Sequence, residues 1–287
     1  MKLRIVTYNI HKGVSSFGTR PRVHALKEAL GLMQADIYFL QEVQGRHDLL
    51  AAKHAAHWPE QSQQDFLAGD SHHVAYGMNA VYDHGHHGNA LLSRFEIISA
   101  LNQDVSDHAY EARGILHCVL RVDGIAVHCY VVHLGLFGAG RKRQTAALIE
   151  AVRSSAPPDA PVIIAGDFND WGNRLSEILR LRLHVTEIFD ESESNIKPGI
   201  AGYLNTLRNP EPRTVPGVLS GLVANIKMSL KLGLKPARTF PAMLPWLRLD
   251  RIYIRGFTVE LAEVLHGAAW AKLSDHAPIV ATLKLKE

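Results

Sequence analysis

The chain has 287 residues, of which 47% are hydrophobic and 7% aromatic, and its formal net charge at pH 7 is +3. This is the composition of a globular protein with a substantial core, and no apolar run approaches the roughly 18 residues of a membrane span. The mild basic bias suits an anionic ligand but lacks the dense basic stripe of a dedicated nucleic-acid binder. The N-terminus alternates like a strand and has no signal-peptide pattern, so we expect a cytoplasmic protein.

Strand-like and helix-like segments alternate along the chain. Short apolar or alternating runs predict strands at 3–10, 37–40, 89–93, 96–101, 114–122, 125–132, 162–165, 250–254, 258–265 and 279–285. Helical spacing of apolar residues predicts helices at 22–33, 142–154 and 175–183. The runs at 89–93 and 96–101 are expected to pair with each other. Because strands outnumber helices and interleave with them, we expect a single α/β domain over 1–287 with mixed or antiparallel sheets.

The two cysteines lie on the strands that flank Asp123-Gly124, a dipeptide typical of a two-residue hairpin turn. In that register Cys118 faces Cys129, so a disulfide between them is geometrically feasible. Disulfides are rare in a reducing cytosol, and we therefore expect two buried free thiols.

The segment from about 191 to 236 differs from the rest of the chain and is expected to be an insertion. Within it, 218–234 has leucine, valine and isoleucine on one helical face and serine and lysine on another. The plainer interpretation is a helix packed on the domain. The alternative is a helix that lies on a lipid surface, since lysine opposite leucine is the pattern of interfacial helices.

Polar and ionisable residues recur where predicted strands begin or end. They are Asn9, Glu42, His133, Asp167, Asn169, Asp250, Asp275 and His276. Each alone could be a cap or turn residue, but strand ends are also where a rigid scaffold presents catalytic groups. Carboxylates and amide oxygens suit a hard cation such as Mg²⁺, with Mn²⁺ as a substitute, whereas two hairpin cysteines cannot build a thiolate zinc site. The sequence has neither a P-loop nor a Gly-x-Ser-x-Gly elbow.

Six short motifs follow one another in a fixed order. They are Thr7-Tyr8-Asn9-Ile10, Gln41-Glu42-Val43, Gly88-Asn89-Ala90-Leu91-Leu92-Ser93, Gly166-Asp167-Phe168-Asn169-Asp170, Leu249-Asp250-Arg251-Ile252 and Ser274-Asp275-His276-Ala277-Pro278. Over nearly its whole length the chain thus resembles the endonuclease/exonuclease/phosphatase superfamily, the group of deoxyribonuclease I-like phosphohydrolases. The resemblance implies a four-layer α/β sandwich, in which two mixed, mostly antiparallel sheets are flanked by helices. It also implies a metal-dependent phosphoesterase.

Residue by residue, the resemblance implies that Glu42 is the principal Mg²⁺ ligand, supported by Asn9, and that Asp275 is a further acidic ligand. It makes Asp167 the catalytic aspartate and Asn169 the amide that positions water or a phosphate oxygen.

In the same resemblance His276 contacts the scissile phosphate and is oriented by Asp250, while His133 lies on the leaving-group side. The general base is left open between Asp167 and His276.

Four further residues are expected at the substrate. Asn89 and Arg113 match motifs that support the site in the family, and His11-Lys12 lies beside the proposed metal ligand Asn9. For His11 and Lys12 a phosphate contact and a simple loop role are equally plausible. The histidines at 72–73 and 84–87 are expected in a solvated loop that borders the site, where they can contact phosphate, rather than in a second metal site.

The sequence restricts the class of substrate less than it restricts the type of reaction. Because 218–234 could set a lipid against the site, we favour a phospholipid or another small phosphodiester, with contact to the inner face of the membrane. The alternatives are a DNA or RNA nuclease, a phosphomonoesterase of the inositol-phosphatase type, and a non-catalytic binding module. Nucleic acid is thus an allowed partner but not the favoured one, and no pattern in the sequence indicates an oligomeric state.

Overall fold

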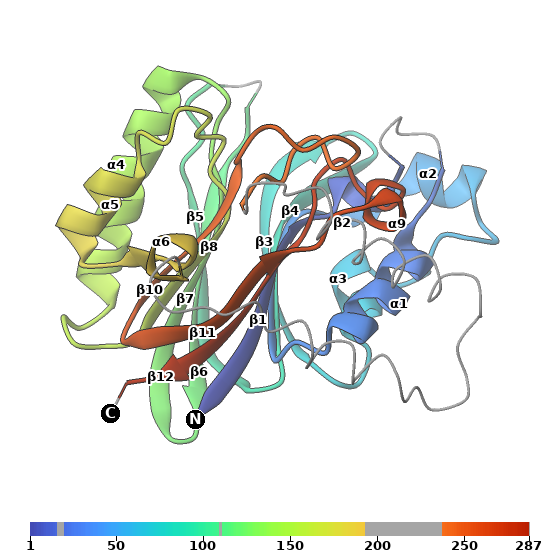
Figure 1. Ribbon diagram of the computed structural model, residues 1–287. Helices are drawn as coiled ribbons and strands as arrows, with labels where there is room; N and C mark the ends of the chain where they lie inside the picture. The colour runs from blue at the N-terminus through green and yellow to red at the C-terminus, as the bar shows by residue number, and fades with distance from the viewer. Residues whose placement is uncertain (16–19, 109–110, 193–236, 287) are drawn as a thin grey trace.

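The computed structural model describes residues 1–15, 20–108, 111–192 and 237–286, and its centre is a pair of six-stranded β-sheets that face each other. Helices cover the outer face of each sheet, so the layers run helix, sheet, sheet, helix (Figure 1). This is the four-layer sandwich with mixed sheets that the family resemblance implied, and that prediction is confirmed.

The first sheet has the order β11-β12-β1-β2-β4-β3. Its strands are β1 (Lys2–Asn9), β2 (Ile37–His47), β3 (His73–Tyr82), β4 (Gly85–Ser93), β11 (Phe257–Val264) and β12 (Ile279–Leu285). Only β1 and β2 run parallel, and they are joined through the 3₁₀ turn η1 (His11–Gly13) and helix α1 (Val23–Met33). A crossover through a helix is what a parallel pair requires.

The second sheet has the order β5-β6-β7-β8-β10-β9. Its strands are β5 (Glu96–Asp104), β6 (Gly114–Val122), β7 (Ile125–His133), β8 (Val162–Asp167), β9 (Thr186–Glu187) and β10 (Asp250–Arg255). Here the parallel pair is β7 and β8, joined by the long helix α4 (Gly138–Ser155). Each sheet therefore contains one crossover helix and is otherwise antiparallel.

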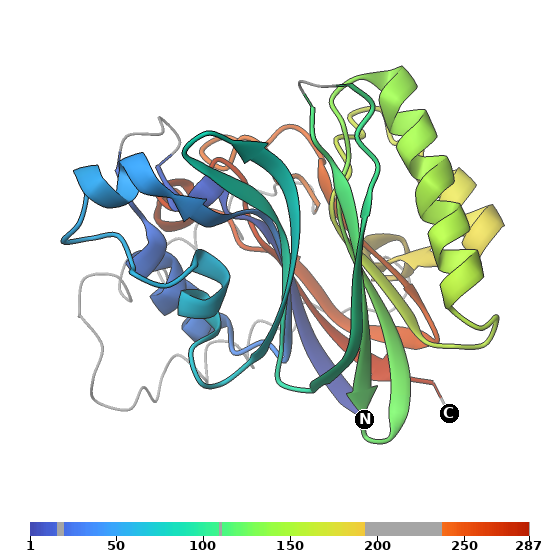
Figure 2. The same ribbon diagram turned by 180° about the vertical axis from the view of Figure 1, so that it is seen from behind.

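The apolar residues form three cores, one between each pair of layers. The space between the sheets is filled by side chains such as Phe39, Leu91 and Ile163. Helices α1 and α3 (Gln63–Ala68) and the short α9 (Ala268–Ala271) pack on the first sheet. Helices α4 and α5 (Ser176–Leu183) pack on the second (Figure 2). The remaining helices are α2 (Asp48–Lys53) and α6 (Ile188–Ser192).

The 123–124 hairpin is confirmed in register, because Cys118 lies opposite Cys129 and both thiols are free and buried. The expected pairing of 89–93 with 96–101 is wrong, because β4 pairs with β2 and β3 whereas β5 pairs with β6 in the other sheet. The histidines at 73 and at 86–87 lie on β3 and β4 rather than in a loop.

The amphipathic stretch 218–234 lies outside the described residues. None of the described helices is long and apolar enough to cross a membrane.

The topology brings distant strand ends to one edge of the sandwich. The parallel strands β7 and β8 end side by side at His133 and Asp167, and the antiparallel β10 begins there with Asp250 opposite Asp167. In the other sheet, β1 ends at Asn9 beside Gln41, next to the Glu42 bulge in β2. Both chain termini lie at the opposite edge (Figure 1).

Candidate active site

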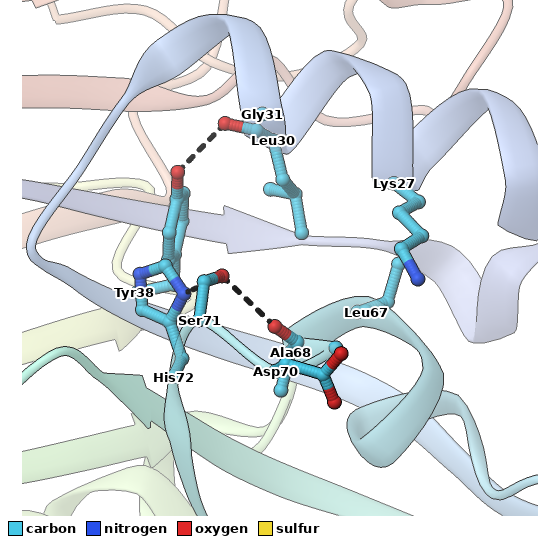
Figure 3. Close-up of a pocket in the computed structure, with 10 residues that line it drawn as sticks. Lys27, Leu30, Gly31, Tyr38, Leu67, Ala68, Asp70, Ser71 and His72 are labelled. Atoms are coloured by element: carbon cyan, nitrogen blue, oxygen red, sulfur yellow. Dashed lines mark hydrogen bonds between the residues drawn. The ribbon is translucent and has the colours of Figure 1, made fainter.

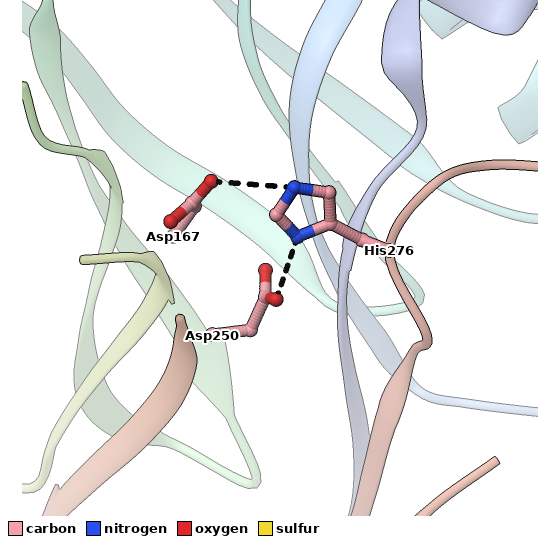
Figure 4. A group of neighbouring side chains, drawn as sticks. All are labelled: Asp167, Asp250 and His276. Atoms are coloured by element: carbon pink, nitrogen blue, oxygen red, sulfur yellow. Dashed lines mark hydrogen bonds and ion pairs between the residues drawn. The ribbon is translucent and has the colours of Figure 1, made fainter. Parts of the chain in front are cut away.

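A buried cluster of two carboxylates and an imidazole occupies this edge (Figure 4). Nδ1 of His276 donates a hydrogen bond to Oδ2 of Asp250 at 2.8 Å, and Nε2 of His276 lies 3.8 Å from Oδ2 of Asp167. All three residues are at most 6% exposed. His276 comes from the loop before β12 in one sheet, while the aspartates come from β10 and β8 in the other. The imidazole thus joins the two sheets at the point where both end.

Two pKa values in this cluster, those of His276 and Asp167, are raised above their ordinary values. Burial alone would lower the pKa of His276, but the attraction and hydrogen bond of Asp250, with help from Asp167, raise it to about 10. Burial, together with repulsion by Asp250, raises the pKa of Asp167 above its ordinary value. His276 is therefore a cation at neutral pH, held between two carboxylates, one of which is a stronger base than an exposed aspartate.

Two loops hold His276 and Asp250 in this geometry. The Ser274 hydroxyl donates to the carbonyl oxygen of Asn9 at 2.7 Å and accepts from the backbone N–H of His276 at 3.2 Å. The buried Thr239 hydroxyl accepts from the backbone N–H of Asp250 at 3.3 Å, and the Thr239 carbonyl accepts from the N–H of Ala277 at 2.8 Å. Ser274 and Thr239 thus fix the two partners of the ion pair relative to each other. Neither was predicted at the site, although Ser274 lies in a recognised motif.

His133 and Asn169 flank Asp167 on its other side. Nε2 of His133 lies 3.6 Å from Oδ2 of Asp167. Burial, and then the charge of Arg113, lower the pKa of His133, so this imidazole is neutral at physiological pH. Asn169 donates its backbone N–H to Oδ1 of Asp167 at 2.9 Å and its side-chain amide to the carbonyl of Leu134 at 2.8 Å. Asp167 therefore lies between a cationic and a neutral imidazole.

Glu42 and Asn9 present oxygen atoms from the first sheet toward the same cluster. The side-chain amide of Asn9 donates to Oδ2 of Asp167 at 3.3 Å, and its Oδ1 accepts from the backbone N–H of His11 at 3.1 Å. Burial opposes the ionisation of Glu42, but the charges of His133, Lys12, His11 and His276 outweigh it and hold the pKa of this carboxyl at about 2. The one ion pair of Glu42 among the described residues is the 3.9 Å contact with Lys12.

Several residues around these groups adopt backbone conformations that residues other than glycine rarely take. His11, Lys12, Glu42 and Asn169 have φ between 46° and 57°. At Glu42 the strain coincides with a register shift between Leu40 and Val43 in β2. Left-handed residues of this kind cost free energy and cluster at functional sites, where the surrounding structure maintains them.

The donor set fits a hard divalent cation. Glu42 is ionised, and Oδ1 of Asp275 lies 3.3 Å from the Ser274 hydroxyl, whose proton is donated to the carbonyl oxygen of Asn9. Oδ1 of Asn9 retains a lone pair beside its single bond. Ligand atoms of Asp167, Asp250 and His276 also lie within 4.8 Å of one another. However, Asp250 and His276 already bind each other there, which leaves the oxygen atoms of Glu42, Asn9 and Asp275 as the donors that could hold an ion.

The remaining predicted residues border this centre in different ways. The Asn89 amide donates to the carbonyls of Gly114 and Val131, at 2.9 and 3.3 Å, and so bridges the two sheets. Arg113 donates to the carbonyl of Leu134 at 3.3 Å and lies 3.6 Å from Glu111. The Nδ1 atom of His11 is enclosed and has no partner in the described part of the chain. Lys12 and His11 are close enough to the centre to lower the pKa of Glu42, and Arg113 is close enough to lower the pKa of His133.

A buried arginine on β10 was missed by sequence reasoning. Arg251 donates to Oδ1 of Asn173 at 2.6 Å and to the carbonyl of Asp170 at 3.0 Å, and so ties the loop after Asp167 to β10. It is adjacent to Asp250 in a recognised motif, but an arginine on a strand carries no sequence signal of burial.

A second hollow lies on the far side of the first sheet, between α1 and the loop after α3 (Figure 3). The Tyr38 hydroxyl there donates to the carbonyl of Leu30 at 2.6 Å, and the Ser71 hydroxyl donates to that of Ala68 at 3.1 Å. The hydroxyl groups of its lining are thus satisfied within the protein, and it contains none of the predicted site residues.

Comparisons with known proteins agree with this arrangement. The model of the Endonuclease/Exonuclease/phosphatase family matches residues 6–276. The uncharacterized protein YbhP of Escherichia coli strain K12 is 37% identical over 285 residues, which cover 98% of this chain and 96% of YbhP.

Among solved structures, an endonuclease/exonuclease/phosphatase from Beutenbergia cavernae matches with a TM-score of 0.64 at 18% identity, over 99% of this chain and 72% of that one. TDP2 from D. rerio, complexed with a single-strand DNA product, matches with a TM-score of 0.62 at 17% identity, over 99% of both chains. At these identities the structural matches establish the fold alone.

Proposed function

This chain belongs to the Endonuclease/Exonuclease/phosphatase family, and from that premise we propose that it is a Mg²⁺-dependent phosphodiesterase. The observation that carries the proposal is the position of Asp167, with His276 3.8 Å and His133 3.6 Å from its Oδ2. Hydrolysis of a phosphodiester needs an oriented water, neutralised phosphate charge and help for the leaving oxygen. Asp167 can orient the water, the cationic His276 can neutralise phosphate charge, and the neutral His133 can assist the leaving oxygen.

In this proposal Asp167 orients the attacking water and accepts its proton. Burial raises the pKa of Asp167, which makes its carboxylate a better base than an exposed one. His276 remains protonated because of Asp250, and it donates a charged hydrogen bond from Nε2 to a phosphoryl oxygen. The neutral His133 lies beside the leaving-group oxygen, and Asn169 holds Asp167 in position through its backbone N–H.

Glu42, Asn9 and Asp275 would hold the Mg²⁺ ion, which supplies Lewis-acid stabilisation of the phosphoryl charge. The ionised Glu42 carboxylate supports this assignment, because it is only partly exposed and its one ion-pair partner among the described residues, Lys12, is 3.9 Å away. Mn²⁺ has the same ligand preference and is an acceptable substitute.

We propose a phospholipid as the substrate, and a rim of exposed apolar side chains supports this class. Leu136 and Phe137 follow β7, Trp171 follows β8, and the loop before β10 carries a third group. The members of that group are Met243, Leu244 and Trp246. All six rim side chains are between 53% and 81% exposed. The third loop also places Phe240 against His276, with 5.0 Å between the ring centroids.

The rim therefore rises from the edge of the sheet that carries Asp167, His133 and Asp250. Large apolar side chains exposed together around a polar site are typical of a surface that meets a lipid or another protein. A lipid surface would deliver a phosphodiester directly to the site. The free, facing thiols Cys118 and Cys129 support a reducing compartment, so we locate this substrate at the inner face of the cytoplasmic membrane.

The substrate is tested by comparing hydrolysis of phosphatidylglycerol vesicles, single-stranded DNA, inositol phosphates and the soluble diester bis-p-nitrophenyl phosphate. We expect vesicle hydrolysis, with a ratio of vesicle to soluble rates that falls at least about 10-fold in Leu244→Ser/Trp246→Ser. Ile125→Ser is the matched control, since Ile125 is an exposed apolar residue at the opposite end of β7. Preferred cleavage of DNA would replace the lipid proposal with the nuclease alternative, and hydrolysis of monoesters alone would favour the phosphatase alternative.

A further inference from the structure

His87 lies on the same face of β4 as the residues that point into the space between the sheets. Side chains alternate along a strand, so 87, 89 and 91 share one face. Asn89 on this face reaches the carbonyls of β6 and β7, and Leu91 belongs to the core between the sheets. The bulges beside β4 insert their extra residues into β2 and β3, so the alternation along β4 is uninterrupted. His87 therefore points toward the second sheet at the end where the site lies.

The charged side chains near the His87 imidazole are those that shift its pKa. Burial, and then the charges of Lys12 and Arg113, lower the pKa of His87 to about 4, while Glu42 opposes them. His87 in turn contributes to the lowered pKa of His133. In the register of β4 with β2, His87 lies opposite Gln44, just beyond the bulge that contains Glu42. His87 therefore borders the site on the side of the proposed metal ligand.

His87 makes no hydrogen bond that accounts for its position. Its Nδ1 atom is enclosed and unpartnered, and neither ring nitrogen bonds to another described residue. The packing contact of the ring is with Tyr82, at 5.9 Å between centroids. A neutral imidazole carries one N–H donor and one acceptor, and a polar group left partly buried without a partner costs free energy. A ligand oxygen can reach Nε2, the ring nitrogen that is not enclosed and that has no hydrogen-bond partner among the described residues.

We propose that His87 binds the substrate, donating a hydrogen bond from its neutral imidazole to an oxygen of the phosphoryl group on the side of Lys12 and Arg113. This inference rests on the proposed function, because it takes the phosphoester to be the ligand of the site. It makes His87 the third active-site histidine, after His133 and His276. The three come from both sheets, and only His276 carries a proton on each ring nitrogen at neutral pH.

His86 provides a matched control, one residue earlier on the same strand. It lies on the opposite face, and its Nδ1 is 3.0 Å from the Tyr76 hydroxyl, to which it is hydrogen-bonded. A substitution there changes another partly exposed histidine of β4 without reaching the site. His87→Phe keeps a ring against Tyr82 and removes the hydrogen bond, whereas His87→Gln restores a donor.

The test measures the dissociation constant of inorganic phosphate for the Mg²⁺-loaded protein by calorimetry. We expect His87→Phe to weaken binding about 10- to 100-fold, the range for a hydrogen bond to a charged group, and His87→Gln to recover part of the loss. His86→Phe should bind within about 3-fold of wild type. Equal affinities in the two Phe variants, or no phosphate binding by wild type, would overturn the inference.

Hydrolysis of bis-p-nitrophenyl phosphate by wild type is measured in parallel. Turnover with equal phosphate affinities would remove His87 from the site and leave the proposed function standing. Phosphate binding that depends on His87 without turnover of any diester would support the inference and contradict the proposed diesterase.

Discussion

The two sheets contribute unlike halves to the candidate site. In the second sheet both aspartates of the site have hydrogen-bond partners within the protein: Asp167 accepts from Asn169 and Asn9, and Asp250 accepts from His276. In the first sheet Glu42 has a single 3.9 Å contact with Lys12, and its position follows from a strained bulge.

The half of the site on the second sheet is therefore already organised by hydrogen bonds within the protein, whereas the half on the first sheet lacks a ligand. Catalytic groups must be held in place before the reaction, and the hydrogen bonds around Asp167 do this without any added component. Glu42 is positioned by a bulged strand and kept ionised by nearby positive charges, and its oxygen atoms, which have few partners among the described residues, can bind a cation. Substitutions in the organised half should therefore reduce turnover, whereas those in the first sheet should change the dependence on Mg²⁺.

The largest effect is expected for Asp167→Asn. Loss of the base should lower kcat for bis-p-nitrophenyl phosphate by about 10³- to 10⁴-fold. Because burial raises the pKa of Asp167, the ionised carboxylate destabilises the fold at neutral pH. The neutral amide should leave the melting temperature equal to or above that of wild type. Kinetics and thermal unfolding together test this, and a lower melting temperature with unchanged kcat would contradict the role of Asp167.

A smaller effect of a different kind is expected for Glu42→Gln. The Mg²⁺ concentration for half-maximal activity should rise at least about 10-fold, with a smaller loss of rate at saturating Mg²⁺. Glu263→Gln is the matched control, because Glu263 is a largely buried carboxyl on β11 with a raised pKa, outside the site. Equal Mg²⁺ dependence in the two variants would remove Glu42 from the metal site.

The smallest effect on turnover, about 10-fold, is expected for Asp250→Asn, because His276 is retained but loses the partner that orients and charges it. The pKa of His276 should fall from about 10, since burial then outweighs the attraction that remains. NMR titration of the imidazole measures this shift. An unchanged pKa would show that Asp250 does not control the charge of His276.

The same variant tests the contribution of the ion pair to stability. The folded pKa of His276, about 10, lies above its ordinary value of 6.5. The pair therefore stabilises the fold fully below pH 6.5 and loses that contribution as pH rises toward 10. The difference in unfolding free energy between wild type and Asp250→Asn should shrink over this window. Asp36→Asn, which removes a surface partner of Arg94, serves as the control.

Local patterns in the sequence were sufficient for most of the strands and for the residues at their ends. Strands such as β8 and β12 are short apolar runs, and Asp123-Gly124 determines the hairpin register because a two-residue turn leaves no alternative. The sequence pattern does not predict β3, because many of its side chains are exposed. Glycine, asparagine and histidine also interrupt the alternation of apolar and polar residues along it. The sheet that each strand joins depends on distant partners, which is why the pairing of 89–93 with 96–101 was wrong.

The distances within the site could not come from the sequence. The contact of His276 with Asp250 spans 26 positions, and that of Asn9 with Asp167 spans 158, so both depend on the way in which the two sheets face each other. His87 was assigned to a loop because Asp-His-Gly-His-His has the composition of one. Only the pairing of β4 with β2 and β3 reveals that this histidine lies on the face toward the site.

The most direct test of the account is the hydrolysis of bis-p-nitrophenyl phosphate by wild type and His276→Ala, each with Mg²⁺ and with EDTA. We predict turnover by wild type with Mg²⁺, none with EDTA, and a loss of about 10²-fold or more in the variant. Circular dichroism of both proteins provides the control for folding. Turnover that persists in EDTA, or that is equal in the folded variant, would contradict a metal-dependent phosphodiesterase centred on Asp167 and His276.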